Sequence, residues 1–303
     1  MTFVAILIGL LPSFLLVGLG AILRPRLSLN AWQGLDKLNF EILFPALLFV
    51  AASQMPLELT KVVSIAPIVW LLLAVGLAVG YLARSFGPEV FRDFAAGWQT
   101  SWRFNTALAF IAVATTEKAG AGEMAVVVGM GVPMANALAV IVLSRGESLG
   151  LWGTVRKVAL NPFLLASLSG VVVGLSGLRI PGPVLAPLEM LSAAAIPIAL
   201  ISVGATMNWG ALARLDRFSG LICTTKLIVM PACALGLAVS LGLESGVAAA
   251  LVIWAALPTA SAAHVLAAGF GADRELAATL VAQTTLLGAA SLTLWITLVE
   301  VVF

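Results

Sequence analysis

Residues 256–280 read ALPTASAAHVLAAGFGADRELAATL. The first half is apolar enough to lie within a membrane, yet it carries Pro258, the hydroxyls of Thr259 and Ser261, and His264, the only histidine in the chain. Proline removes a backbone donor from a helix and frees a carbonyl. At membrane depth such backbone is tolerated only where it is buried in protein or lines a cavity. The stretch therefore predicts a broken transmembrane helix with polar groups at its break.

The composition of the whole chain agrees with a membrane environment. Of 303 residues, 61% are hydrophobic and 10% are charged, and the mean hydropathy is +1.12. Soluble domains carry about a quarter charged residues, so lipid must be the solvent of this all-α integral membrane protein. The net charge of +2 is too small to suggest nucleic-acid binding. One histidine and the distant cysteines Cys223 and Cys233 predict neither a metal site nor a disulfide, and we expect no cofactor.

A membrane-spanning helix needs about 20 largely apolar residues. The N-terminal MTFVAILIGL lacks a basic segment, so we interpret it as part of the first such helix and not as a cleaved signal peptide. The sequence offers ten candidate spans: 3–23, 32–52, 63–83, 94–115, 123–144, 161–177, 187–207, 217–241, 245–269 and 275–300. Residues 145–160 form the longest connection, which we expect to be a cytoplasmic linker, either an interfacial amphipathic helix or an ordinary loop.

Basic residues predict the orientation of the chain in the cell membrane. The loops after spans 1, 3, 5, 7 and 9 hold ten lysines and arginines, and the loops after spans 2, 4, 6 and 8 hold three. An excess of basic residues marks the cytoplasmic side. We therefore expect both termini to lie outside the cytoplasm.

The two halves of the chain resemble each other in sequence. Four matches occur in the same order at nearly constant offsets: Pro12 with Pro162, Pro45 with Pro197, Thr106 with Thr259, and Glu123 with Glu275. They divide the chain into a first repeat, 1–144, and a second, 161–303, of five spans each. An odd number of spans inverts the second repeat, and inverted repeats are typical of secondary transporters.

The repeat superposes the centres of the fourth and ninth spans. Asn105 and Thr106 lie at the first centre, and Pro258 lies at the second. Two breaks related in this way can cross and present half-helix ends to one ligand. Half-helix N-termini carry partial positive charge and unpaired N–H groups, which suit an anion.

Longer motifs carry a family resemblance that runs nearly end to end. The stretches LNFEILFPALLF, FNTALAF, NPFLLASLSGVVVGLSGLRIPGPV, AAIPIALISVGATM and LPTASAAHVLAAGFGADRELAATLV resemble the auxin efflux carrier family of permeases, whose bacterial members include malonate and other organic-acid transporters. The resemblance implies ten spans in a five-plus-five inverted repeat, crossed broken helices 4 and 9, and an elevator-type motion. Helices 1, 2, 6 and 7 would form the scaffold, and helices 3–5 and 8–10 the transport domain.

The sequence departs from the family pattern at the breaks. Family members usually carry a proline in the helix 4 break, but here Phe104 precedes the Asn-Thr pair and Ala109 and Phe110 follow it. Ala262 and His264 replace a common asparagine and tyrosine in helix 9. The resemblance therefore does not carry over the identity of the substrate.

The candidate substrate-binding residues gather at the two breaks: Arg103, Asn105, Thr106, Pro258, Thr259, Ser261 and His264. Asn105 and Thr106 bind the ligand or cap the broken helix. Arg103 is a counter-charge for a carboxylate, a member of a structural ion pair, or a residue that snorkels to the interface. His264 carries a coupling proton, lines the site or serves in packing.

A second set of residues lies farther from the breaks. Lys226, Gln283 and Asn136 are supporting candidates that either line the cavity or hydrogen-bond between helices. Pro45 and Pro197 are candidate helix breaks or hinges. For Asp36, Lys37 and Glu41 we expect local pairing or interfacial anchoring, since Glu41 lies four residues after Lys37.

The main hypothesis is a secondary transporter of small organic anions, carboxylates in particular, that works by elevator-type alternating access. A sodium-coupled symporter of the bile-acid carrier type is the first alternative, and a membrane-embedded enzyme is a remote one. We expect no enzymatic activity, because one histidine and few core carboxylates offer no convergent acid and base. The expected partners are the anion, the bilayer, a coupling proton or sodium ion, and a second copy bound through the scaffold.

Overall fold

The structure is a computed structural model that describes residues 2–54, 59–145, 156 and 159–303. Every regular element in these ranges is a helix, as the composition predicts. Most of the predicted linker 145–160 lies outside the described residues, so its form and its cytoplasmic position stay predictions.

The first half of the chain forms helices in each of the first five predicted ranges. The elements are α1 (Thr2–Leu23), η1 (Arg24–Arg26), α2 (Leu29–Leu38), η2 (Asn39–Leu43), α3 (Phe44–Ser53), α4 (Leu59–Tyr81), η3 (Leu82–Phe86), α5 (Phe91–Trp98), η4 (Gln99–Ser101), α6 (Thr106–Val113) and α7 (Ala121–Ser144). The segment η2 is a π-helical turn that joins α2 to α3, and Pro45 is the second residue of α3.

The second half of the chain occupies the other five predicted ranges. Its elements are α9 (Pro162–Ser176), α10 (Gly182–Thr206), α11 (Arg217–Thr224), η5 (Thr225–Val229), α12 (Met230–Ser240), α13 (Ser245–Ala256), α14 (Ala262–Gly269) and α15 (Arg274–Val302). Pro197 lies inside α10, which continues without interruption on both sides of it. The structure thus has no break at Pro197, and a hinge there stays a prediction.

Helix length and composition identify six candidate spans in the described chain. These are Phe3–Arg26, Val63–Phe86, Ala121–Ser144, Gly182–Thr206, Arg217–Ser240 and Arg274–Val302. Shorter apolar helices cover Pro162–Ser176 and Ser245–Ala256. The protein is a multi-pass membrane protein, and the ten-span arrangement belongs to the proposals below.

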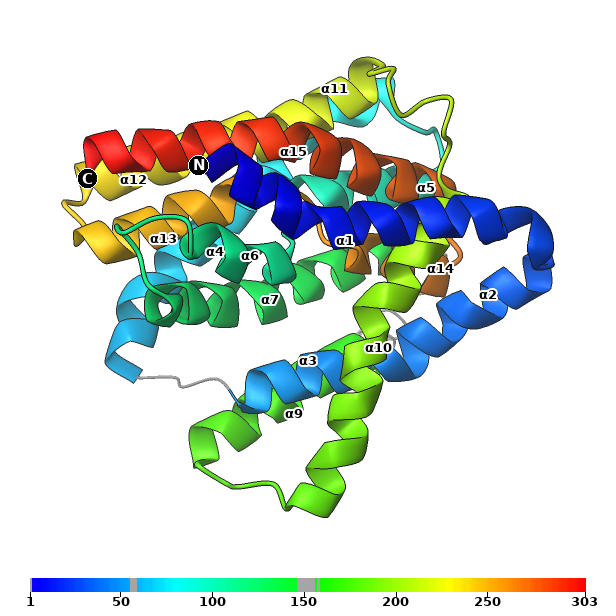
Figure 1. Cartoon of the computed structure of the whole chain (residues 1–303), viewed down its shortest axis with the longest axis horizontal. Coiled ribbons are helices and arrows are strands. Elements are labelled where there is room, and N and C mark those ends of the chain that lie inside the picture. The colour runs from blue at the N-terminus through cyan, green and yellow to red at the C-terminus, as the bar shows by residue number, and fades with distance from the viewer. Residues whose placement is uncertain (1, 55–58, 146–155, 157–158) are drawn as a thin grey trace.

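In two helix pairs, α1 with α10 and α3 with α9, the backbones approach each other closely where the helices meet (Figure 1). In the first crossing, a Cβ on Gly20 would collide with the carbonyl oxygen of Ile201. In the second, a Cβ on Gly170 would lie 2.7 Å from the carbonyl oxygen of Phe49. Small residues let two helix backbones approach where apolar burial supplies no driving force between helices. Glycine therefore determines both crossings.

A second group of helices packs around α13, whose residues from Ala248 to Ala256 are all buried. The helices α7, α12 and α15 surround α13 (Figure 1). Consequently the chain at the end of α13, where the predicted break lies, is placed deep inside the molecule.

We predict that Gly20→Ala destabilises the protein by about 1–3 kcal/mol, because the added methyl forces two backbones apart. The measurement is thermal unfolding of the purified protein in detergent. Gly18→Ala on the same helix is the control, since a Cβ there meets no atom within 4 Å. Equal melting temperatures for the two variants would contradict the role of Gly20 in the crossing.

Candidate functional site

The first helix interruption separates η4, which ends at Ser101, from α6, which begins at Thr106. Asn105 has an extended backbone, and its side-chain oxygen accepts a hydrogen bond from the Leu108 N–H at 3.3 Å. Asparagine is a strong N-cap because its oxygen satisfies a donor in the first helical turn. Asn105 thus performs the capping role that the sequence allowed.

The second interruption separates α13, which ends at Ala256, from α14, which begins at Ala262. The carbonyl of Pro258 accepts a hydrogen bond from the Asn105 N–H at 2.8 Å, so the two breaks are bonded to each other. The Thr259 hydroxyl donates to the carbonyl of Thr100 at 2.7 Å. The carbonyls of Pro258 and Thr100 are therefore each satisfied by the opposite segment, while the Thr259 N–H donates to the Thr284 hydroxyl of α15 at 3.3 Å.

A cavity lies on either side of this junction, of about 410 Å³ on one side and about 330 Å³ on the other. Asn105 and Ser261 line both of them. The first cavity is enclosed mainly by α3, α7 and α9, and the second by α1, α10 and α15. The junction is thus a thin partition between two hollow spaces.

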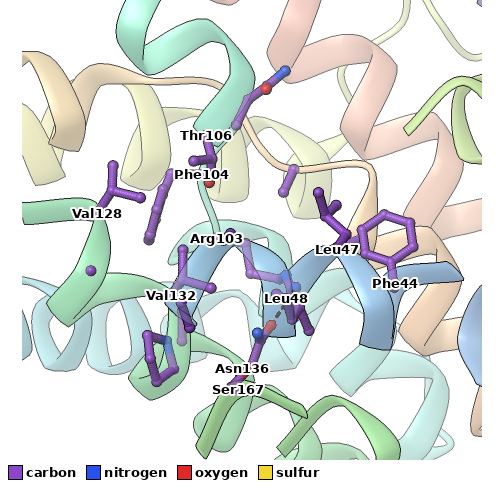
Figure 2. A pocket seen from close by; sticks show the side chains of 18 of the residues that line it. Phe44, Leu47, Leu48, Arg103, Phe104, Thr106, Val128, Val132, Asn136 and Ser167 are labelled. Atoms are coloured by element: carbon purple, nitrogen blue, oxygen red, sulfur yellow. Dashed lines mark hydrogen bonds between the residues drawn. The ribbon is translucent and has the colours of Figure 1, made fainter. Parts of the chain in front are cut away.

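Arg103 is the charged group of the first cavity and is only 4% exposed. Its Nη2 donates to the Oδ1 of Asn136 at 2.8 Å (Figure 2). Its Nε and Nη1 atoms, and the Nδ2 of Asn136, have no hydrogen-bond partner among the described residues. Figure 2 shows this pair between apolar side chains of α3 and α7, including Leu48 and Val132. Guanidinium nitrogens without a partner can donate hydrogen bonds to an anion such as a carboxylate.

The helix ends add to the positive potential of the first cavity. Thr106 begins α6 and Ala262 begins α14, and both residues line the cavity. Helix N-termini carry partial positive charge. Among the described residues that line this cavity, none is acidic.

Four predicted binding or supporting residues line neither cavity: Pro258, which lies at the junction itself, and three residues farther away. Lys226 is fully buried, and its Nζ donates to the carbonyl of Ala255 at 2.7 Å, at the end of α13. The Nε2 of Gln283 donates to the carbonyls of Ala211 and Arg214 at 3.0 and 3.3 Å. His264 is fully buried and lines neither cavity.

The partner of His264 is a residue that we expected elsewhere. Lys37 and Glu41 do pair locally, at 3.9 Å, but local pairing or interfacial anchoring is wrong for Asp36. Asp36 is 3% exposed; its Oδ1 lies 3.3 Å from the Nε2 of His264, and its Oδ2 lies 2.5 Å from the Nη1 of Arg274. The spacing in the sequence could have indicated this, because Asp36 lies four residues after Trp32 and three before Asn39, on the same helix face. The structure buries all three residues.

Comparison with known proteins agrees with these observations. A family model described as "Membrane transport protein" matches residues 151–296. A protein of Rhizobium meliloti (strain 1021), named "Putative malonate transporter", is 29% identical over 307 residues, which is 93% of this chain and 92% of the relative. The chain is thus similar over most of its length to a transporter, and its second half matches a family of membrane transport proteins. A second relative is an "Uncharacterized transporter" of Methanothermobacter thermautotrophicus, 32% identical over 142 residues, which is 46% of each chain.

We predict that Asn105→Ala weakens α6 by about 1 kcal/mol, the usual cost of losing an N-cap. Hydrogen–deuterium exchange should then become faster at the α6 amides. Asn105→Asp is the matched control, because a carboxylate oxygen still accepts from the Leu108 N–H. Faster exchange in the Asp variant as well would show that α6 does not depend on this cap.

Proposed function

We propose that this permease is a secondary transporter of small organic anions that carry a carboxylate. The observation that carries the proposal is the guanidinium of Arg103, buried at the edge of a cavity with two nitrogen atoms that lack partners in the described chain. A buried charge costs free energy unless a partner or a cavity compensates it. A carboxylate would supply the missing partner, since guanidinium binds carboxylates through paired hydrogen bonds.

The neighbouring polar groups fit the same ligand. Asn105, Thr106 and Ser261 line the cavity beside the start of α6 and α14. They offer donors next to two partially positive helix ends. Pro258 is expected to act through geometry, because its carbonyl bonds the two breaks together. Thr259 lines the second cavity and stays a candidate for ligand contact, although its hydroxyl donates to the Thr100 carbonyl here. The name of the Rhizobium meliloti relative, a malonate transporter, also supports a carboxylate.

The proposal includes an elevator-type motion of the transport domain past the scaffold. The crossings of α1 with α10 and of α3 with α9 support a scaffold built from the first, second, sixth and seventh spans, which are α1, α2 with α3, α9 and α10. The equivalent positions of Gly20 and Gly170 in the two halves support the five-plus-five inverted repeat. An elevator motion would move the bonded breaks past this scaffold, so that Asn105 and Ser261 face each side of the membrane in turn.

The test is transport in proteoliposomes under a set potassium-diffusion potential. We expect uptake and efflux of mono- or dicarboxylates, with an inside-negative potential favouring export by about 2.3 kcal/mol per charge per 100 mV if no co-ion moves. Repeating the assay in a sodium gradient separates this proposal from a sodium-coupled symporter. A preference for neutral or cationic solutes would overturn the proposal.

Arg103→Gln should weaken carboxylate affinity roughly tenfold to hundredfold, because a hydrogen bond to a charged group contributes about 1.5–3 kcal/mol. The matched control is Arg217→Gln, which removes an exposed arginine that lies over the Phe86 ring. Unchanged affinity in Arg103→Gln would show that Arg103 is structural.

The orientation is tested separately. The bias of basic residues places both termini outside the cytoplasm, so alkaline phosphatase fused after Phe303 should be active and a cytoplasmic reporter fused there should be silent. The opposite pattern would reverse the assigned sides without affecting the site.

A further inference from the structure

A buried polar cluster joins four helices away from both cavities. Asp36 comes from α2, Ser202 from α10, His264 from α14, and Arg274 begins α15. The Ser202 hydroxyl donates to the Oδ1 of Asp36 and lies 3.2 Å from the Nε2 of His264. The Nδ1 of His264 lies 3.1 Å from the backbone carbonyl oxygen of Arg274. The imidazole is therefore held between oxygen atoms at both ring nitrogens.

Neither neutral form of this imidazole satisfies its surroundings. A carbonyl oxygen can only accept, so the Nδ1 of His264 must carry a proton to bond the Arg274 carbonyl. The Nε2 atom is then a bare acceptor, and the single proton of the Ser202 hydroxyl cannot satisfy both neighbours. If it is donated to Asp36, Nε2 faces two acceptor oxygens; if it is donated to Nε2, the serine oxygen and the Oδ1 of Asp36 become two acceptors in contact. Placing the proton on Nε2 moves the same conflict to Nδ1. A doubly protonated ring removes both conflicts.

We infer that Asp36 and His264 form a proton-binding site that holds α2 and α10 against α14 and α15. The bound proton completes a hydrogen bond from the Nε2 of His264 to Asp36, while Arg274 neutralises the second carboxylate oxygen. Loss of the proton leaves two acceptors in contact and weakens the junction. While the ring of a separated conformation is neutral, this conformation binds one more proton, so its population rises as pH falls and levels off once the separated ring is protonated as well.

Other charged groups do not explain the contact. Most other charged side chains on the elements packed against α14 have partners elsewhere: Lys37 with Glu41, Asp93 with the Asp273 amide, Asp273 with the Leu276 amide, Glu123 with the Gly120 amide, Glu189 with Gln54, and Glu300 with Thr116. Glu275 is exposed, and Arg92 is not among the described partners of Asp36 or His264. The response to pH is thus assigned to this cluster.

The site rests on the proposed function in one respect. Under that proposal α2 and α10 belong to the scaffold, and α14 and α15 belong to the transport domain. The proton then binds across the boundary that an elevator motion must open. Its release and rebinding would couple the motion to pH whatever anion occupies the cavity.

The experiment measures distances between spin labels in the full chain, without substrate. The labels are placed at two exposed positions, Gln33→Cys on α2 and Glu89→Cys just before α5, a helix that packs against α14 and α15. The distance between them reports how far α2 lies from α14 and α15. The background replaces Cys223 and Cys233 by alanine. Between pH 8 and pH 5 we expect the short-distance population to grow, with the population ratio changing at most about tenfold per pH unit for one proton.

Three variants test whether the pH response of the distance comes from Asp36 and His264. His264→Gln offers a permanent amide donor to Asp36 and should keep the short distance at every pH. Asp36→Asn should abolish the pH response. Glu41→Gln, which alters an exposed carboxylate five residues along the same segment, should respond like the parent. A parent protein whose distances ignore pH, or a His264→Gln variant that responds fully, would overturn the proton site. Both readouts are independent of transport, so failure here is distinct from failure of the anion proposal.

Discussion

The hydrogen bond from the Asn105 N–H to the Pro258 carbonyl is the constraint on which the rest of the structure depends. A broken helix inside a membrane exposes backbone groups that no water can satisfy. Here each break supplies partners for the other, and Thr259 adds a second bond through the carbonyl of Thr100. The two interruptions therefore stabilise each other. This requirement brings residues from distant parts of the chain to one point and creates a partition with a cavity on each side.

The surrounding helices serve this junction in two ways. Glycines at the crossings of α1 with α10 and of α3 with α9 allow backbones to touch, which favours a rigid frame. Around the breaks the chain places buried cations with incomplete or backbone partners. Lys226 donates to the carbonyl of Ala255 at the end of α13, where the helix dipole is negative. Arg103, which lines the first cavity, keeps two nitrogen atoms without a partner in the described chain. The Lys226 ammonium is thus bonded to protein, whereas the Arg103 guanidinium is bonded only in part, and the proposed anion site follows from this difference.

Polar chemistry also occurs where the two helix groups meet. Asp36, Ser202, His264 and Arg274 link α2 and α10 to α14 and α15, and the link requires one proton more than a neutral imidazole carries. A transporter that moves one group past the other must separate such contacts in every cycle. Placing the proton site at that boundary and the anion site at the junction of the breaks keeps the two binding events physically separate, although a single motion would connect them.

The sequence by itself determined the all-helical membrane character, the positions of the helices, and the interruptions near Asn105 and Pro258. Those features depend on local hydropathy, on the missing N–H of Pro258 and on the capping ability of Asn105, which are properties of short segments. It also singled out Arg103, because a charge in an apolar segment is visible without coordinates. Only the tertiary structure decided that Asn136 is the partner of Arg103, that Lys226 and Gln283 face carbonyls and not a cavity, and that Asp36 meets His264. These outcomes depend on which helix faces pack together over separations such as the 228 residues between Asp36 and His264, and no local pattern encodes that choice.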